Sequence, residues 1–420
     1  MSFTTRMLAA VLFGAALLSG GTAVQGAEEQ GEEQKAGSTF MSQQTYNRIS
    51  RSHTAIEEGK YQEALNELLD LADDVKDRPY EHAVTLQSIG YVYINQEKWE
   101  LAAQYFSRAV RLNALPEEPQ KQAIYTLAQI YATTGEFQKT IDLLTDWFKT
   151  AKNPPADAYI ILARAYSAQE RYSEAHQPAK QAIAKSDKPR EDWYKLLLGI
   201  QYELNKYAEA AGTLEVLVAN WPDKEIYWKQ LSGIYVELGQ EDKALATLAT
   251  AYGRGLVEKS GDILNLARLY MLNEVPFQGG KILEASLNKG EVEKTQKNYE
   301  LLSQAWVQAR EYKKAISALS AAAALADDGA LFVRAAQLEM SLANWEGAVT
   351  AARKAIEKGE LDSKMTGQAY LLLGTAAAEQ KDFDVAINAF NKARGYPETR
   401  KTASQWLSFV QTEQQVTSLN

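Results

Sequence analysis

Reactive and metal-binding side chains are scarce in this 420-residue sequence, which has no cysteine and three histidines. Without cysteine there is no disulfide, no thiolate ligand and no attachment site for a lipid thioether. None of the histidines, His53, His82 and His176, lies within four residues of another, so their spacing indicates neither a zinc site nor a catalytic triad. Glycine-rich segments also lack the Lys-Ser/Thr pair that holds a phosphate. We therefore expect no enzymatic activity, no cofactor and no metal.

Long apolar runs are also missing, apart from one near the N-terminus. Arg6 precedes the apolar stretch 7–18, and mostly small residues follow it to Ala27. This arrangement is typical of a secretory signal peptide, and the run is shorter than the about 20 residues that span a bilayer. We expect residues 1–27 to be removed on export to the periplasm, leaving no segment inserted in the membrane.

Positive charge is in deficit, because 45 Lys and Arg stand against 54 Asp and Glu, a net charge of −9. An acidic surface is a poor match for nucleic acid or for anionic membranes. Residues 28–41 carry several of these acids among Gln, Gly and Ser, a composition that favours a disordered acidic linker. The partners that remain are proteins.

What the sequence does contain is an internal repeat. A six-residue motif returns about every 36 residues. It consists of Gly or Asn, any residue, an aromatic residue, any two residues and Ala. The copies end at Ala64, Ala102, Thr140, Ala175, Ala210, Ala244, Gly280, Ala315, Ala348 and Ala386. Such a period predicts one supersecondary unit stacked many times.

The second repeat carries the clearest resemblance to a known family. It offers Gly90 and Tyr93 in an expected first helix, Trp99 at the turn, then Ala102 and Phe106 in a second helix. This pattern resembles the tetratricopeptide repeat, in which a small residue lets two helices cross closely. The resemblance implies an all-α, right-handed solenoid of about ten helix-turn-helix repeats over residues 42–396. An amphipathic pattern then predicts a capping helix within residues 397–420.

Stacked first helices would form a groove, and two rows of positions should point into it. One row holds Tyr125, Ile160, Lys195 and Lys229, and the other holds Tyr91, Gln129 and Arg164. The rows predict an aromatic end in the second and third repeats and a basic strip in the fourth to sixth. A basic strip on an acidic protein favours an acidic or carboxylate-bearing partner segment.

Aromatic residues are dense between residues 193 and 235. Four of them coincide with repeat anchors and should be core: Tyr194, Tyr207, Trp228 and Tyr235. Four others do not, and we expect at least two of these to be exposed in an interface: Trp193, Tyr202, Trp221 and Tyr227.

A second resemblance concerns the run from Tyr227 to Gly239 and its continuation from Ala244 to Leu256. This stretch resembles periplasmic repeat proteins that accompany TonB-type energy-transducing systems. The resemblance implies a non-enzymatic adaptor that works with TonB, ExbB and ExbD in the uptake of iron complexes. Two other functions stay open: an assembly factor for cell-wall or exopolysaccharide machinery, and a sugar-binding or hydrolytic protein that stacks glycans on the aromatic residues.

Overall fold

The structure, a computed structural model, describes the backbone of residues 40–419, with side chains to residue 416. Within these residues the chain forms 21 α-helices and no β-strand, which confirms the all-α prediction. The predicted leader lies outside the described residues, and so does the acidic linker apart from Phe40 and Met41.

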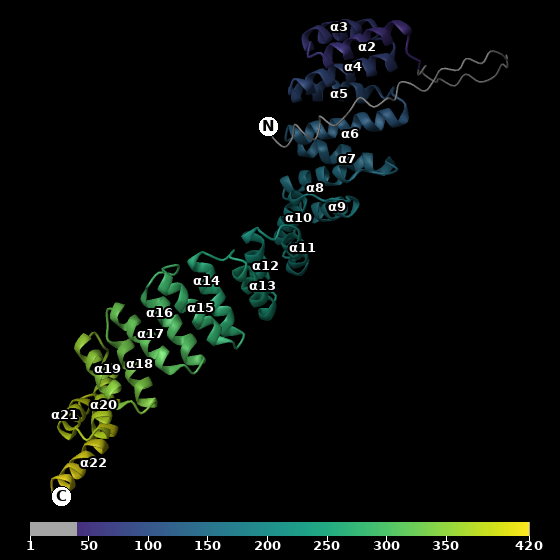
Figure 1. The fold of residues 1–420 in the computed structure, drawn as a ribbon. Helices are drawn as coiled ribbons and strands as arrows, with labels where there is room; N and C mark the ends of the chain where they lie inside the picture. Colours follow the sequence, from purple (N-terminus) through teal and green to yellow (C-terminus); the bar gives the residue numbers. More distant parts are fainter. Residues whose placement is uncertain (1–39, 420) are drawn as a thin grey trace. The chain divides into compact units, whose positions relative to one another are not determined.

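The chain divides into two compact units between Lys206 and Tyr207, inside the fifth predicted repeat. The N-terminal unit contains α2 (Gln43–Glu57), α3 (Tyr61–Asp74), α4 (Pro79–Asn95), α5 (Trp99–Leu112), α6 (Glu117–Thr133), α7 (Phe137–Thr150), α8 (Ala156–Ala168), α9 (Tyr172–Lys185) and α10 (Glu191–Glu203). Helices α2 to α9 pair as consecutive hairpins, and each second helix also contacts the first helix of the next hairpin (Figure 1).

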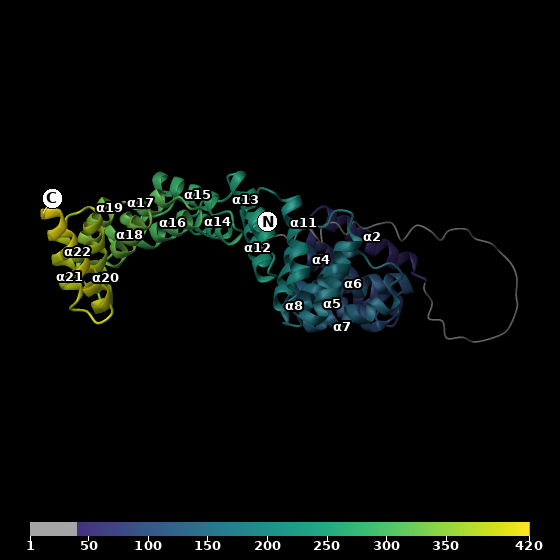
Figure 2. The ribbon, with the colours of Figure 1, turned by 90° about the horizontal axis from the view of Figure 1, so that it is seen from below.

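The C-terminal unit continues this pattern (Figure 2). It contains α11 (Tyr207–Asn220), α12 (Glu225–Glu237), α13 (Glu241–Gly253), α14 (Ser260–Leu272), α15 (Pro276–Lys289), α16 (Gln296–Gln308), α17 (Tyr312–Leu325), α18 (Ala330–Ser341), α19 (Trp345–Lys358), α20 (Ser363–Glu379), α21 (Phe383–Ala393) and α22 (Arg400–Leu419). Helices α12 to α21 form five hairpins within this unit.

The first residue of the repeated motif sets the turn inside each hairpin. Gly59, Glu97 and Gly135 have φ of 75°, 57° and 77°, and equivalent turns also place one residue at positive φ. The amide of the next residue then donates to a carbonyl five residues back, as Lys98 N does to Tyr93 O at 2.9 Å. This bond closes the end of the first helix, which explains why glycine and asparagine recur there.

The small anchors let the two helices of a hairpin cross closely. A Cβ on Gly90 would lie 2.5 Å from the ring of Phe106, and one on Gly374 would lie 2.7 Å from the ring of Phe390. Both rings are fully buried. Each large residue therefore fills the space that its glycine leaves open, as the repeat resemblance implies.

Two irregular repeats keep the same architecture. In the seventh, Pro276 begins α15 as expected, but the anchor is Gly279 and not Gly280. Gly279 is the fourth residue of its helix, like Ala64 in α3, and a Cβ on it would lie 2.8 Å from the carbonyl oxygen of Ala267. In the third repeat, buried Thr140 replaces alanine because its hydroxyl donates to the carbonyl of Glu136 at 3.2 Å.

The last helix covers the end of the C-terminal unit, which confirms the predicted capping helix. Leu407 and Val410 of α22 are buried with Phe390 of α21 in one apolar cluster. Trp406 stacks on Phe390, with ring centroids 5.9 Å apart and an interplanar angle of 13°. The helix therefore removes from water an apolar face that a terminal repeat would otherwise expose.

Candidate functional site

The predicted aromatic end of the groove lies in the N-terminal unit, and half of it is covered. Tyr125 is buried in α6 and stacks on Trp147 of α7, with centroids 5.1 Å apart. Trp147 is fixed there because its Nε1 donates to the carbonyl of Lys121 at 2.9 Å. Burial raises the pKa of Tyr125. Tyr91 is half-buried with its edge against Phe106, so the expectation of an open aromatic surface is wrong for Tyr125.

Two of the three cations of the predicted basic strip, Arg164 and Lys229, form ion pairs within the stack. Arg164 of α8 forms an ion pair with Asp192 of α10. Arg190 adds contacts of 3.6 Å to Asp157 and 3.7 Å to Asp192. These charges link successive first helices to one another, so Arg164 is not the free cation that the sequence predicted.

The C-terminal unit repeats this arrangement. Lys229 of α12 lies 2.8 Å from Asp262 of α14 and 3.1 Å from Glu225, and the bond to Asp262 raises its pKa. Arg334 of α18 likewise pairs with Glu300 of α16 at 3.5 Å.

Two other members of the first predicted row lie in the N-terminal unit. There, Lys195 is exposed and has no ion pair among the described residues. Ile160, from the same row, is fully buried.

The aromatic cluster does not lie as expected. Trp193 and Tyr227 are buried, and Tyr202 and Trp221 are half-buried, so the expectation that at least two of the four are exposed is wrong. Trp193 and Tyr227 are each the third residue of a first helix, and Trp193 packs between α8 and α9 against Ile160 and Ala182. The third residue of a first helix faces the preceding hairpin because the first helix packs against that hairpin.

The four aromatics expected in the core also differ among themselves. Tyr235 is buried, whereas Tyr194, Tyr207 and Trp228 are half-buried. Trp228 lies at the helix surface with its Nε1 donating to the carbonyl of Pro222 at 2.8 Å. A ring at an anchor position therefore need not be enclosed.

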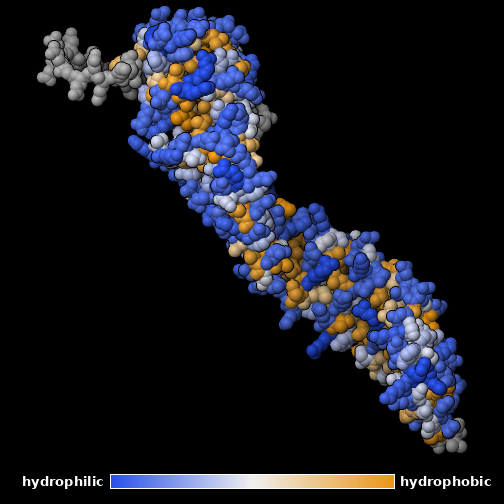
Figure 3. All heavy atoms as spheres, turned by 180° about the vertical axis from the view of Figure 1, so that it is seen from behind, coloured by the Kyte–Doolittle hydropathy of each residue, from blue (hydrophilic) through white to orange (hydrophobic). Residues whose placement is uncertain are grey.

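An apolar row on the first helices of the C-terminal unit was not predicted from the sequence. Each member stands eight residues before the small residue that ends the repeated motif. We call these residues the apolar row: Val236, Met271, Val307, Met340 and Ala378. Val236 is 42% exposed and Val307 is 37% exposed, and the others are half-buried. Apolar patches among hydrophilic side chains are visible on the face of each unit shown in Figure 3. The signal was present in the sequence as an apolar residue at the same offset in five repeats.

On two first helices, the apolar row shares a face with a paired charge. Lys229 and Val236 on α12, and Glu300 and Val307 on α16, are each seven residues apart, about two turns, so each pair lies on one side of its helix. These two helices therefore present apolar side chains beside internally paired charges. Such a surface suits a protein segment, because an apolar centre with a polar rim is the usual composition of an interface.

The described part of the chain contains neither a metal-binding cluster nor a membrane-spanning helix. From residue 40 to residue 419, no group of three or more His, Cys, Asp or Glu side chains is placed to hold a metal ion. None of the helices over that range has the length and apolar character needed to cross a bilayer. His53, half-buried, lies 3.2 Å from Ser88 Oγ, and burial lowers its pKa.

Comparison with known proteins agrees with the repeat architecture. The family model described as tetratricopeptide repeat matches residues 161–225 and 333–398. Among curated proteins, none matches the chain. The stacked hairpins define a helical repeat protein, and the family match covers the repeats within residues 161–225 and 333–398.

Several solved structures are similar in fold. A tetratricopeptide repeat protein from Parabacteroides merdae is 15% identical, with a TM-score of 0.36 over 71% of this chain and 100% of its own. A MamA protein is 20% identical, with a TM-score of 0.33 over 42% of this chain and 94% of its own. YrrB, described as having an unusual peptide-binding site, is 14% identical, with a TM-score of 0.36 over 43% and 90%. Likenesses this low carry no information on function.

Proposed function

We propose that this tetratricopeptide repeat protein is a protein-binding scaffold whose apolar row holds a segment of its partner. The observation that carries the proposal is the repetition of exposed or half-exposed apolar side chains at one position of successive first helices. Burying such a row against a partner gains about 25 cal/mol per Å² of apolar surface. Because Lys229 and Arg164 already have acidic partners, the apolar contacts supply the affinity.

The finer proposal is a periplasmic accessory role in a TonB-dependent system that takes up iron complexes. It is supported by the resemblance of the run from Tyr227 to Leu256 and by the leader-like segment at residues 1–27. The partners would be periplasmic parts of TonB, ExbB or ExbD. The acidic net charge of −9 favours a protein partner over nucleic acid.

Photo-crosslinking in the native cell envelope tests both levels of this proposal. A photoreactive residue at Val236 or Val307 should capture a partner, whereas one at Lys281, exposed on α15, should not. Recovery of TonB, ExbB or ExbD supports the energy-transduction role, and recovery of wall or polysaccharide synthases points to an assembly factor instead. Equal capture from Lys281 would contradict the assignment of the apolar row.

Charge reversal at Lys195 tests whether the exposed lysine takes part. Lys195→Glu changes an exposed side chain that has no ion pair among the described residues, so it should alter partner binding without altering the fold. Reversal at Lys229 is a poor test of binding because it also removes the pair with Asp262. Unchanged affinity for the captured partner after Lys195→Glu would exclude Lys195 from the interface.

A further inference from the structure

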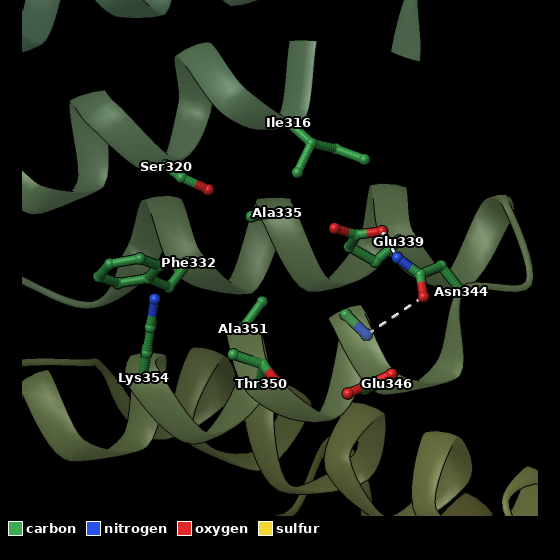
Figure 4. Close-up of a pocket in the computed structure, with 11 residues that line it drawn as sticks. Ile316, Ser320, Phe332, Ala335, Glu339, Asn344, Glu346, Thr350, Ala351 and Lys354 are labelled. Carbon is green, nitrogen blue, oxygen red and sulfur yellow. Dashed lines mark hydrogen bonds between the residues drawn. The ribbon is translucent and has the colours of Figure 1, made fainter. Parts of the chain in front are cut away.

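A groove in the C-terminal unit is lined by residues that do not belong to the apolar row. It has a volume of about 320 Å³ and lies between the second helices α17 and α19, with α18 between them (Figure 4). Ile316, Ala335 and Ala351 form its apolar centre, and the last two are buried. Its volume is at the lower end of the range for ligand sites, about 300–1,000 Å³.

The two ends of this groove carry opposite charge. Glu339 and Glu346 lie at one end, and Lys354 lies at the other beside Phe332, its Nζ 5.8 Å from the ring centroid (Figure 4). Across the described residues, none of these three charged side chains forms an ion pair. This contrasts with Arg164 and Lys229, whose charges are met inside the stack.

The acidic end is held in place by its surroundings. Asn344 donates from Nδ2 to Glu339 Oε2 at 2.7 Å and accepts from the amide of Gly347 at 3.4 Å. A Cβ on Gly347 would lie 2.5 Å from Asn344 Nδ2 and 2.6 Å from Glu339 Cδ. Glycine at 347 therefore allows the carboxylate and the amide to lie against the start of α19.

We propose that this groove binds an extended internal segment of a partner protein with the pattern basic, any, apolar, any, acidic. Glu346 and Lys354 are eight residues apart on α19, which corresponds to about 12 Å. In an extended chain, residues four apart point the same way and lie about 13 Å apart, and the residue midway between them faces the same side. The basic side chain then meets Glu339 and Glu346, the acidic one meets Lys354, and the apolar one meets Ala335 and Ala351.

The groove favours an internal segment over a free peptide because its ends are open. Glu346, Thr350 and Lys354 are all exposed, so a chain can continue past both charged ends. Opposite charges at the two ends select a segment by complementarity, and each exposed ion pair adds a modest gain. The proposal deepens the scaffold function, on which it rests, by naming the chemistry of one partner segment.

The test uses blocked, dye-labelled peptides and the full chain, with binding followed by fluorescence anisotropy at low salt. The peptide Gly-Lys-Ser-Val-Ser-Glu-Gly should bind, and Gly-Lys-Ser-Val-Glu-Ser-Gly, whose acid points to the opposite side, should bind about two- to fivefold more weakly. Equal binding of the two peptides would overturn the proposed register. If only peptides with free termini bind, the groove recognises a chain end, and the proposal of an internal segment is wrong.

Matched protein variants test the location. Lys354→Glu should weaken binding of the first peptide and strengthen binding of Gly-Lys-Ser-Val-Ser-Lys-Gly, whereas Lys313→Glu, on the exposed surface of α17 outside the groove, should change neither. Thr350→Trp, which fills the groove from an exposed position, should remove detectable binding of every peptide. Identical behaviour of Lys354→Glu and Lys313→Glu would overturn the site.

The groove and the scaffold function can fail separately. If crosslinkers in the apolar row capture a partner whose binding ignores Thr350→Trp, and the peptides do not bind, the groove proposal falls and the scaffold stands. If the peptides bind but no partner is captured from the apolar row, the groove stands and the apolar row falls as the proposed partner site.

Discussion

Replacing Gly374 with alanine should destabilise the last hairpin, although alanine is the better helix former. A Cβ on Gly374 would lie 2.7 Å from both Cδ1 and Cε1 of Phe390, closer than real Cβ contacts allow. Phe390 is fully buried and stacked on Trp406, so its ring has little room to move away. The new methyl group must therefore push α20 and α21 apart.

The magnitude follows from two opposing terms. Overpacking in a core costs about 1–3 kcal/mol, and replacing glycine by alanine in a helix interior gains about 1 kcal/mol. The net effect of Gly374→Ala is a loss of about 0–2 kcal/mol in the free energy of unfolding. Gly233 in α12 is the matched control, since no atom lies within 4 Å of its Cβ position. Gly233→Ala should show only the gain.

Hydrogen exchange measured by mass spectrometry suits this comparison because repeat arrays open locally as well as globally. Amides of α20 and α21 should exchange faster in Gly374→Ala, and amides of α12 should exchange more slowly in Gly233→Ala. A Phe390→Leu background should reduce the cost of Gly374→Ala by giving the methyl group space. Equal protection in both single variants would refute the argument from close helix crossing.

Substitutions at three residues test the charged and titratable side chains. Arg48→Gln removes a side chain that pairs with three carboxylates of α3, and it should lower the free energy of unfolding of the N-terminal unit by about 1 kcal/mol. If added salt does not change this loss, the contribution of Arg48 comes from packing and not from its ion pairs. Burial and the hydrogen bond to Glu215 raise the pKa of Tyr235 to about 12. The free energy that protonated Tyr235 contributes to folding is therefore complete below about pH 10 and is lost between about pH 10 and 12. This pH dependence of stability should be absent in Tyr235→Phe. Lys229→Glu should lower the melting temperature more than Lys229→Met, because it adds a carboxylate beside Asp262, and equal effects would show that repulsion is negligible.

The fold could be predicted from the sequence because each repeat contains the residues that form its turn and that let its two helices pack closely. Gly59 and Gly135 occupy the left-handed turn position, and Gly90 faces Phe106 across the hairpin. In the seventh repeat the sequence offers two adjacent glycines of equal size, and the expectation of Gly280 is wrong. Only the start of α15 at Pro276 identifies Gly279 as the anchor.

The site was less predictable because it depends on contacts between repeats. The period placed Arg164 and Lys229 on first helices, but their partners Asp192 and Asp262 lie 28 and 33 residues further on, at no constant offset. A repeat pattern fixes which helix a residue belongs to and leaves the identity of its neighbour open. The expected exposure of Trp193 is wrong for the same reason, since the preceding hairpin encloses its side chain.

The ion pairs change what the first helices can bind. A free basic strip would attract acidic segments over a distance, and its binding would weaken steeply with salt. Lys229 instead neutralises Asp262, so an acidic partner would have to replace a contact of 2.8 Å that already exists. The proposed affinity then comes from the apolar row, where burial depends less on salt than an exposed ion pair does. The groove between α17 and α19 has charges that form no ion pair within the described residues, so the recognition proposed there should weaken as salt rises.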